Sequence, residues 1–218
     1  LSKKIKKKFK PKNILEIGCN DGTFASNFKK KDIVCIEPCE EAAIEAKKKG
    51  LKVYIKYFDD FLIKKLIKDH KKFDVIFSAN TITHISDFNS VFYNVSRILS
   101  DNGTFIVEEP SLLETIKKNS YDQFYNEHIY VFSTIALQNI LKKNDLEIYD
   151  VENIKVHGGS NRYYIKKTKN RKIKILNRFK KNVNLEKKFG IHKFSCYQNF
   201  SKKVKDSKTK MIELFKKL

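Results

Sequence analysis

The stretch that decides the fold is Asn13-Ile-Leu-Glu-Ile-Gly-Cys-Asn-Asp-Gly-Thr-Phe24. An apolar run over residues 14–17 predicts a short buried strand, and a turn built on Gly18 and Gly22 follows it. Residues 24–31 then favour a helix. A strand, a glycine turn and a helix in this order are typical of the first unit of a nucleotide-binding α/β sheet. The glycines let a ligand approach the backbone closely, and the helix N-terminus offers free N–H groups.

The acid before the turn, Glu16, completes the pattern E-x-G-x-N-x-G. This pattern resembles motif I of class I S-adenosylmethionine (SAM) methyltransferases, with Asn20 at the position where the commonest form of the motif has its middle glycine. The resemblance implies a Rossmann-like fold and SAM as the cofactor, with Glu16 among the residues that bind it.

The rest of the chain alternates strand-like and helical runs, which predicts a doubly wound, mostly parallel α/β sheet. We expect strands over 33–37, 52–57, 73–79 and 104–108, a turn over 101–103, and helices over 40–49, 60–68, 88–100 and 134–143. Two late strands, 146–151 and 162–166, are joined through Gly158-Gly159 and place an antiparallel strand at the end of the sheet. Ligands of such sheets lie at the carboxyl ends of the strands.

The composition changes after residue 168, and we divide the chain into a methyltransferase domain, 1–168, and a lysine-rich helical extension, 169–218. The extension has an amphipathic helical pattern. A surface helix packed on the domain and a partner-binding helix explain that pattern equally well.

The net charge of +21 suggests nucleic acid or another anionic partner. However, recognition of phosphates and bases favours the arginine fork. The 46 basic residues are nearly all lysines spread along the chain, and the arginines are only Arg97, Arg162, Arg171 and Arg178. The composition therefore argues against a nucleic-acid partner.

Composition also bears on location. No apolar run approaches the length of ~20 residues that a membrane span needs, and the polybasic N-terminus has no apolar block behind it. The four cysteines, Cys19, Cys35, Cys39 and Cys196, lack the spacing of a metal site, so we expect reduced thiols in a cytoplasmic protein and no metal. Because the chain begins with Leu1, we expect it to be a fragment.

Several acids and aromatics follow the predicted strands. Glu37 ends the second strand about twenty residues after the glycine turn, where a carboxylate accepts both ribose hydroxyls. Asp21 either faces the cofactor or caps the following helix. Phe58 and Asp59 follow the third strand, at the expected position of the adenine.

Later polar residues are candidates for catalysis. Asn80 is placed to face the cofactor, and His84 lies just beyond it, with a structural role as the alternative. Tyr125, Glu127 and His128 crowd together after the fifth strand, and such a group suits proton transfer. The alternative is a loop that packs tyrosine rings over the sheet.

Five segments together resemble the nucleotide-sugar C-methyltransferases, SAM-dependent enzymes that methylate a ring carbon next to the ketone of a 4-keto-6-deoxy sugar nucleotide. These segments are GCNDGTF, IEP, AN-x3-HI, YD-x2-Y-x-EH and HGGS-x-R, in this order within residues 12–167.

The resemblance assigns roles to matching positions. His128 would remove the proton beside the ketone, Glu127 and Tyr125 would position it and the sugar, and His84 would assist near the keto group. SAM would be held by Gly18, Asn20, Asp21, Gly22, Glu37 and Asn80.

The chain also departs from this family. It has no cysteine cluster for the family's N-terminal zinc-binding domain, it stops early in the family's C-terminal domain, and Asn126 replaces a histidine. A partner chain that supplies the missing parts is one explanation. Two other functions stay open: a class I methyltransferase acting on RNA or another small molecule, and a truncated SAM-binding domain without turnover.

Overall fold

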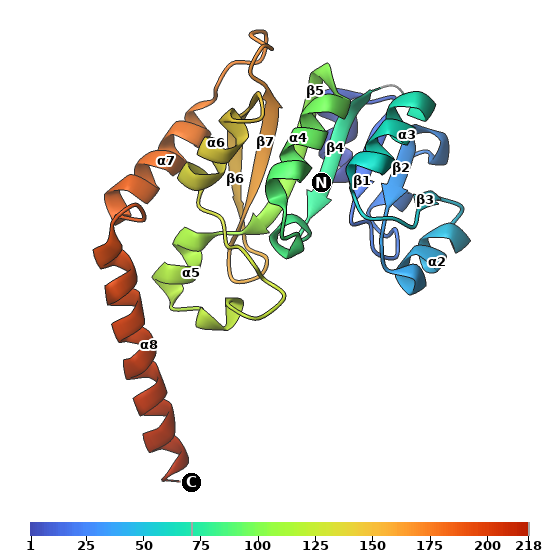
Figure 1. Ribbon diagram of the computed structural model, residues 1–218. Helices are drawn as coiled ribbons and strands as arrows, with labels where there is room; N and C mark the ends of the chain where they lie inside the picture. The colour runs from blue at the N-terminus through green and yellow to red at the C-terminus, as the bar shows by residue number, and fades with distance from the viewer. Residues whose placement is uncertain (71, 218) are drawn as a thin grey trace.

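A computed structural model describes residues 1–70 and 72–217. Its centre is a seven-stranded sheet with the strand order β3-β2-β1-β4-β5-β7-β6 (Figure 1). Strands β1 to β5 pair in parallel, and β7 runs antiparallel between β5 and β6. This confirms the predicted doubly wound sheet with a late antiparallel strand. The strands are β1 (Ile14–Ile17), β2 (Ile33–Ile36), β3 (Lys52–Tyr54), β4 (Phe73–Ala79), β5 (Leu99–Pro110), β6 (Leu146–Ile154) and β7 (Ser160–Lys167).

Helices cover both faces of the sheet, which is why every residue of β1 and β2 is buried. One apolar core joins the sheet to α3, α4 and α6, and a second core joins the other face to α1 and α2. The helices are α1 (Ser2–Phe9), α2 (Glu40–Lys48), α3 (Asp60–His70), α4 (Phe88–Ile98), α5 (Leu112–Lys118), α6 (Thr134–Lys142), α7 (Asn177–Phe189) and α8 (Phe194–Phe215).

The helix predicted over residues 24–31 is wrong. Two short 3₁₀ turns, η1 (Ala25–Asn27) and η2 (Lys30–Asp32), replace it. The side-chain amide of Asn27 donates to the carbonyls of Thr23 and Phe24, and the Ser26 hydroxyl donates to the carbonyl of Gly22. These side-chain bonds compete with the backbone bonds that would extend a helix.

Strand β5 is longer than predicted and includes residues 101–103, where we expected a turn. Its pairing with β4 is irregular there, because Leu99 pairs with Phe73 and Thr104 pairs with Val75. The strand therefore bulges over these residues.

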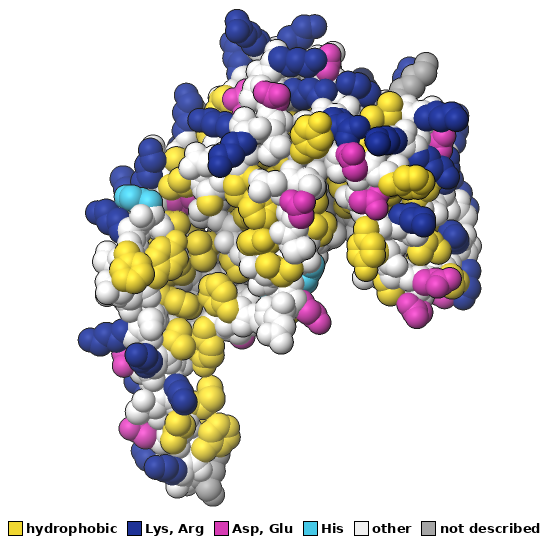
Figure 2. Space-filling model, viewed as in Figure 1, with side chains coloured by type: hydrophobic (Ala, Val, Ile, Leu, Met, Phe, Trp, Pro, Cys, Tyr) yellow, Lys and Arg dark blue, Asp and Glu magenta, His cyan; other side chains and the backbone are white. Residues whose placement is uncertain are grey.

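The C-terminal region is helical, as predicted. Helix α7 packs on β6 and α6 and buries Asn182 and Glu186, whereas α8 extends away from the rest of the molecule (Figure 1). Hydrophobic side chains line one side of α8 (Figure 2), and among them Leu214 is 59% and Phe215 67% exposed. Over residues 1–70 and 72–217, no helix has the length and apolar character needed to cross a membrane.

Candidate active site

The glycine turn after β1 lies at the carboxyl end of the sheet. Gly18 has φ +71°, and a Cβ there would overlap the side chain of Thr81, so only glycine fits. Asn20 is also left-handed, with φ +50°, a conformation that asparagine tolerates better than most residues. The N–H groups of Gly18 and Cys19 both donate to the carbonyl of Ile36, which ties the turn to β2.

Glu37 follows β2 and is fixed by the turn. Its carboxylate accepts from the backbone N–H of Asn20 at 2.8 Å and from that of Cys39 at 2.9 Å. Each carboxylate oxygen can accept a second hydrogen bond, so a diol can still bind to the same group. Glu37 lines the cleft described next, and ribose binding by its carboxylate stays a prediction.

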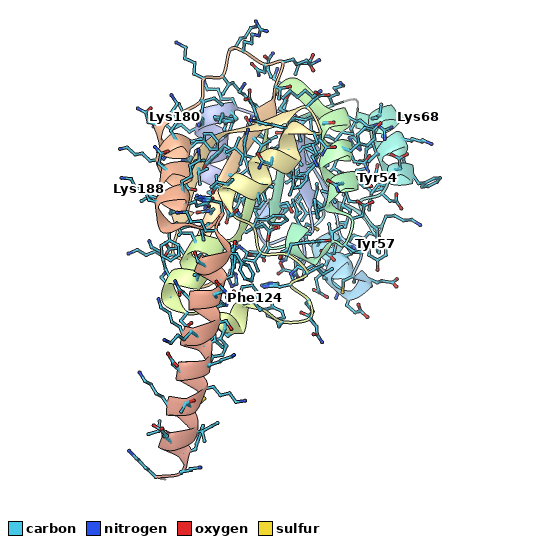
Figure 3. The ribbon with its side chains drawn as sticks, turned by 60° about the vertical axis from the view of Figure 1, so that its left-hand side comes forward. Tyr54, Tyr57, Lys68, Phe124, Lys180 and Lys188 are labelled. Carbon is cyan, nitrogen blue, oxygen red and sulfur yellow. The ribbon has the colours of Figure 1, made fainter. Side chains whose placement is uncertain are left out.

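A cleft of about 450 Å³ opens over this edge of the sheet. Its volume lies within the range of ~300–1,000 Å³ typical of small-molecule sites. The residues that line it come from the ends of four parallel strands and the turns that follow them: Ile17, Gly18, Asn20, Ile36, Glu37, Pro38, Tyr57, Phe58, Ala79, Asn80, Thr81, His84 and Ile85. Tyr57, labelled in Figure 3, is 76% exposed at the rim and was not anticipated from the sequence.

Four residues expected to bind the cofactor lie beside this cleft and do not line it. Asp21 accepts from the N–H of Thr23 and pairs with Lys49 at 2.8 Å, and these partners lower the pKa of its carboxyl to about 2. Asp59 accepts from the N–H of Leu62 at the start of α3. Gly22 packs against Leu51 and Ala46.

The fourth, Glu16, is buried beneath the glycine turn. Burial raises the pKa of its carboxyl to about 9, although a hydrogen bond from the N–H of Ala25 acts to lower it. One of its carboxyl oxygens has no partner among the described residues. Glu16 therefore supports the turn from below.

The turn that follows β4 carries His84. The Nδ1 of His84 lies 2.7 Å from the carbonyl oxygen of Glu127, which can only accept, so Nδ1 carries the proton. This contact links the turn to the loop that contains His128. The His84 and His128 rings lie 5.1 Å apart, centroid to centroid.

His128 is held by two groups of its own loop. Its Nδ1 donates to the carbonyl of Gln123 at 2.9 Å, and its Nε2 lies 2.7 Å from the Tyr125 hydroxyl. A neutral imidazole with Nδ1 protonated has its lone pair on Nε2, so the Tyr125 O–H donates to it. The loop thus presents a base and a phenol already joined by a hydrogen bond.

The other predicted polar residues lie around this pair. The Glu127 side chain is exposed, and only its backbone carbonyl contacts His84. The amide of Asn80, which lines the cleft, donates to the Nε2 of His157 at 3.3 Å, so the β6–β7 hairpin reaches the site as well.

Sequence analysis missed Glu109, the most enclosed acid of the site. It lies near the end of β5 with no exposed surface, and it accepts from the N–H groups of Thr81 and Ile82. Its one sequence signal is its place near the end of a buried strand.

The sheet order, the glycine turn and the acid after β2 define a class I SAM-dependent methyltransferase. A family profile described as a methyltransferase domain matches residues 1–151, and one described as a C-methyltransferase C-terminal domain matches residues 155–218. The chain belongs to the methyltransferase domain family, whose cofactor in this fold is SAM.

Two curated relatives match the chain. C-methyltransferase NovU of Streptomyces niveus is 28% identical over 149 residues, which are 67% of this chain and 36% of NovU. A ubiquinone biosynthesis O-methyltransferase of Pelagibacter ubique is 30% identical over 158 residues, 68% of this chain and 59% of that protein. The chain thus spans between about a third and three fifths of these relatives.

Solved structures share the fold. A SAM-dependent methyltransferase of Thermotoga maritima, a possible histamine N-methyltransferase, has a TM-score of 0.53 at 23% identity. The match covers 70% of this chain and 81% of the Thermotoga chain. Magnesium protoporphyrin IX methyltransferase of Synechocystis, solved with S-adenosylhomocysteine (SAH), has a TM-score of 0.52 at 14% identity, covering 70% of this chain and 73% of its own.

Proposed function

We propose that the chain carries the methyl-transfer site of a C-methyltransferase that acts on a 4-keto-6-deoxy nucleotide sugar, at the carbon next to the ketone. The observation that carries this proposal is the hydrogen-bonded pair Tyr125–His128, whose imidazole lies beside His84, a residue that lines the SAM cleft. Methylation at a carbon needs a base, whereas a cleft without a base suits more acidic acceptors. The C-methyltransferase profile over residues 155–218 and the similarity to NovU support the same choice.

The chemistry follows from the position of the proton. The base takes the proton of the carbon beside the ketone, and the C–H electron pair moves into an enolate. That carbon then forms a bond to the methyl group, and the C–S bond breaks with its electron pair on sulfur. SAM supplies the electrophilic methyl, so the protein has to supply proton transfer and alignment.

Two routes lead the proton to His128. Nε2 could take it directly after the Tyr125 hydroxyl moves aside. Alternatively, the Tyr125 oxygen takes the carbon proton while its own proton passes to Nε2 along the existing 2.7 Å contact. We favour the second route because it needs no rearrangement of the loop.

The remaining residues would hold the reactants. Gly18, Asn20, Glu37 and Asn80 would contact SAM, with Phe58 beside the adenine, while Glu16, Asp21, Gly22 and Asp59 would shape the loops around it. A protonated His84 would donate from Nε2 to the ketone oxygen as the enolate forms, since such donors stabilise a developing oxyanion. The exposed carboxylate of Glu127 would bind a sugar hydroxyl.

The test is mass spectrometry of a dTDP-4-keto-6-deoxyhexose incubated with the protein and SAM in heavy water. We expect a product heavier by one methyl group, and loss of both methylation and deuterium uptake in His128→Gln. The matched control is His192→Gln, because His192 is exposed in the turn before α8. Deuterium uptake without methylation would support the base but not the alignment of the methyl group. If the wild type shows neither methylation nor deuterium uptake, the proposal is overturned.

O-methylation is the second candidate, because the relative from Pelagibacter ubique is an O-methyltransferase. The same experiment separates the two. An O-methyl product would carry the added mass without deuterium at the carbon beside the ketone, and fragmentation would place the methyl on oxygen.

A further inference from the structure

We propose that Glu109 is a positioning residue for methyl transfer, which holds the turn over residues 81–84 so that the SAM cleft and the His128 loop keep one alignment. The expected effect of Glu109 on the methyl-transfer rate rests on the proposed function, but its expected effect on the position of this turn does not.

The Glu109 carboxyl binds the backbone N–H groups of this turn. Its Oε1 accepts from the N–H of Thr81 at 3.2 Å and from that of Ile82 at 2.9 Å, and the N–H of Thr83 also bonds to the carboxyl. Three successive N–H groups directed at one acceptor form an anion-binding nest. Because Glu109 belongs to β5, which pairs with β7 at this position, the turn is fastened to the rigid centre of the sheet.

One end of the turn meets the cofactor side. The Thr81 side chain fills the space that a Cβ of Gly18 would occupy, and its hydroxyl donates to the carbonyl of Ala79 at 3.0 Å. A shift of Thr81 would therefore displace the glycine turn, which lines the cleft.

The other end of the turn meets the catalytic loop. The carbonyl of Thr83 accepts from the N–H of Ile129 at 3.0 Å, and the Thr83 hydroxyl donates to the carbonyl of Tyr130. His84 adds its own bond to the carbonyl of Glu127. Both reacting sides of the site are thus attached to one turn, and that turn is attached to Glu109.

The charge of Glu109 is set by its surroundings. The titratable groups that interact electrostatically with it are Glu108 on the same strand and Tyr163 on β7, and Glu186 of α7 interacts in turn with Tyr163. All of these are acidic or neutral. Burial outweighs the bonds from the N–H groups and raises the pKa of Glu109 to about 8. Ionisation near this value strengthens the bonds to the turn, and it adds a negative charge beside the N–H groups that immediately precede His84 in the chain.

Two measurements test the inference without any acceptor. The first is calorimetry of SAH binding. The second is NMR of the histidine rings, which is practical because the chain has only five histidines. The variants are Glu109→Ala, which removes the acceptor, and Glu109→Gln, which keeps an amide oxygen for the N–H groups but cannot ionise. Glu108→Gln is the matched control, since Glu108 is the neighbouring acid and pairs with Arg162 outside the cleft.

In Glu109→Ala we expect the His84 and His128 resonances to move, and methyl transfer to fall about 100-fold with SAH affinity changing less than about tenfold. In Glu109→Gln we expect wild-type resonances and rates at pH values below the pKa of Glu109. The change in His84 chemical shift that accompanies Glu109 ionisation should be absent from this variant alone.

Unchanged His84 and His128 resonances in a folded Glu109→Ala protein would overturn the inference, as would a His84 chemical-shift change near the pKa of Glu109 that persists in Glu109→Gln. If Glu109→Ala does not fold, the Gln variant alone decides. These outcomes differ from a failure of the proposed function, in which the wild type would not methylate the keto sugar although its histidine resonances still respond to Glu109.

Discussion

At the scale of single residues, Gly18 shows how a missing side chain positions the site. Ala at this position would combine a left-handed backbone with an overlap on Thr81. We expect Gly18→Ala to weaken SAH binding by at least about tenfold, measured by calorimetry. Gly190→Ala is the control, because Gly190 has φ +87° at the end of α7 and a Cβ there would meet only the Lys193 side chain, at an ordinary contact distance of 3.7 Å. Equal SAH affinities for both variants would contradict the close-approach explanation.

The Tyr125–His128 pair gives a second prediction at this scale. If the proton reaches Nε2 through the phenol, Tyr125→Phe should slow deuterium uptake by the keto sugar by about 100-fold. Tyr121→Phe, on the same loop, should leave the rate unchanged. Uptake at the wild-type rate in Tyr125→Phe would show that His128 takes the proton directly.

At the scale of elements, α7 belongs to the body of the molecule. Glu186 is fully buried and accepts from the N–H of Thr134 at 2.7 Å and from that of Ile135 at 3.0 Å, so a residue of α7 caps the first turn of α6. Helix α6 directly follows the loop that contains His128. The expected boundary at residue 168 thus separates segments that share a buried contact.

Removing this cap should be costly. Glu186→Ala leaves two buried N–H groups without an acceptor, and we expect the free energy of unfolding to fall by about 2–4 kcal/mol in urea titrations. Glu186→Gln should cost less, because one oxygen remains. Glu213→Ala, on the exposed part of α8, should change stability little. A loss no larger than that of Glu213→Ala would show that the α7–α6 contact does not hold in solution.

The elements also show what sequence could predict. Buried runs such as residues 73–79 were placed to the residue, because a short apolar run between a charged residue, Lys72, and a polar one, Asn80, has few alternatives. The failure over residues 24–31 came from Ser26 and Asn27, whose side-chain bonds to the backbone leave no periodic signal.

The candidate site divides in the same way. Glu37, Asn80 and His84 could be placed at the cleft because each follows a strand at the carboxyl edge, whereas His128 lies on a later loop and its catalytic role stays a prediction. The capping contact of Asp59 depends on side-chain direction, which its position in the chain does not reveal, whereas for Asp21 a capping role was one of the two alternatives. Glu109 was missed because its partners are backbone N–H groups of a turn distant in sequence.

At the scale of the whole molecule, buried acids should make stability depend on pH. The folded pKa values of Glu16, about 9, and Glu109, about 8, lie above the unfolded value near 4.5, so the folded state keeps protons that the unfolded state loses. Stability should therefore fall by up to several kcal/mol as pH rises from about 5 to 9. The pKa of His70 is lowered by burial, so this residue alone would make stability rise with pH near its unfolded pKa of 6.5.

The measurement is urea unfolding across this pH range. The double variant Glu16→Gln with Glu109→Gln should flatten the plot of unfolding free energy against pH above neutrality. The control Glu45→Gln should not, because Glu45 is an exposed acid on α2. A wild-type stability that is constant or rises between pH 6 and 9 would contradict the burial of these two charges (about 1.4 kcal/mol per pKa unit).

The apolar stripe on α8 and the net charge of the whole chain have opposite effects on self-association. Met211, Leu214 and Phe215 are each about half exposed or more, and exposed apolar patches favour association. A net charge of +21 opposes it through long-range repulsion, which salt screens. We therefore expect sedimentation to show monomers at low salt and association as salt rises. Leu214→Gln should reduce that association, whereas Ile44→Gln, a comparable exposed position on α2, should leave it unchanged. Association that weakens with salt would instead show that charge pairs, not the apolar stripe, join the molecules.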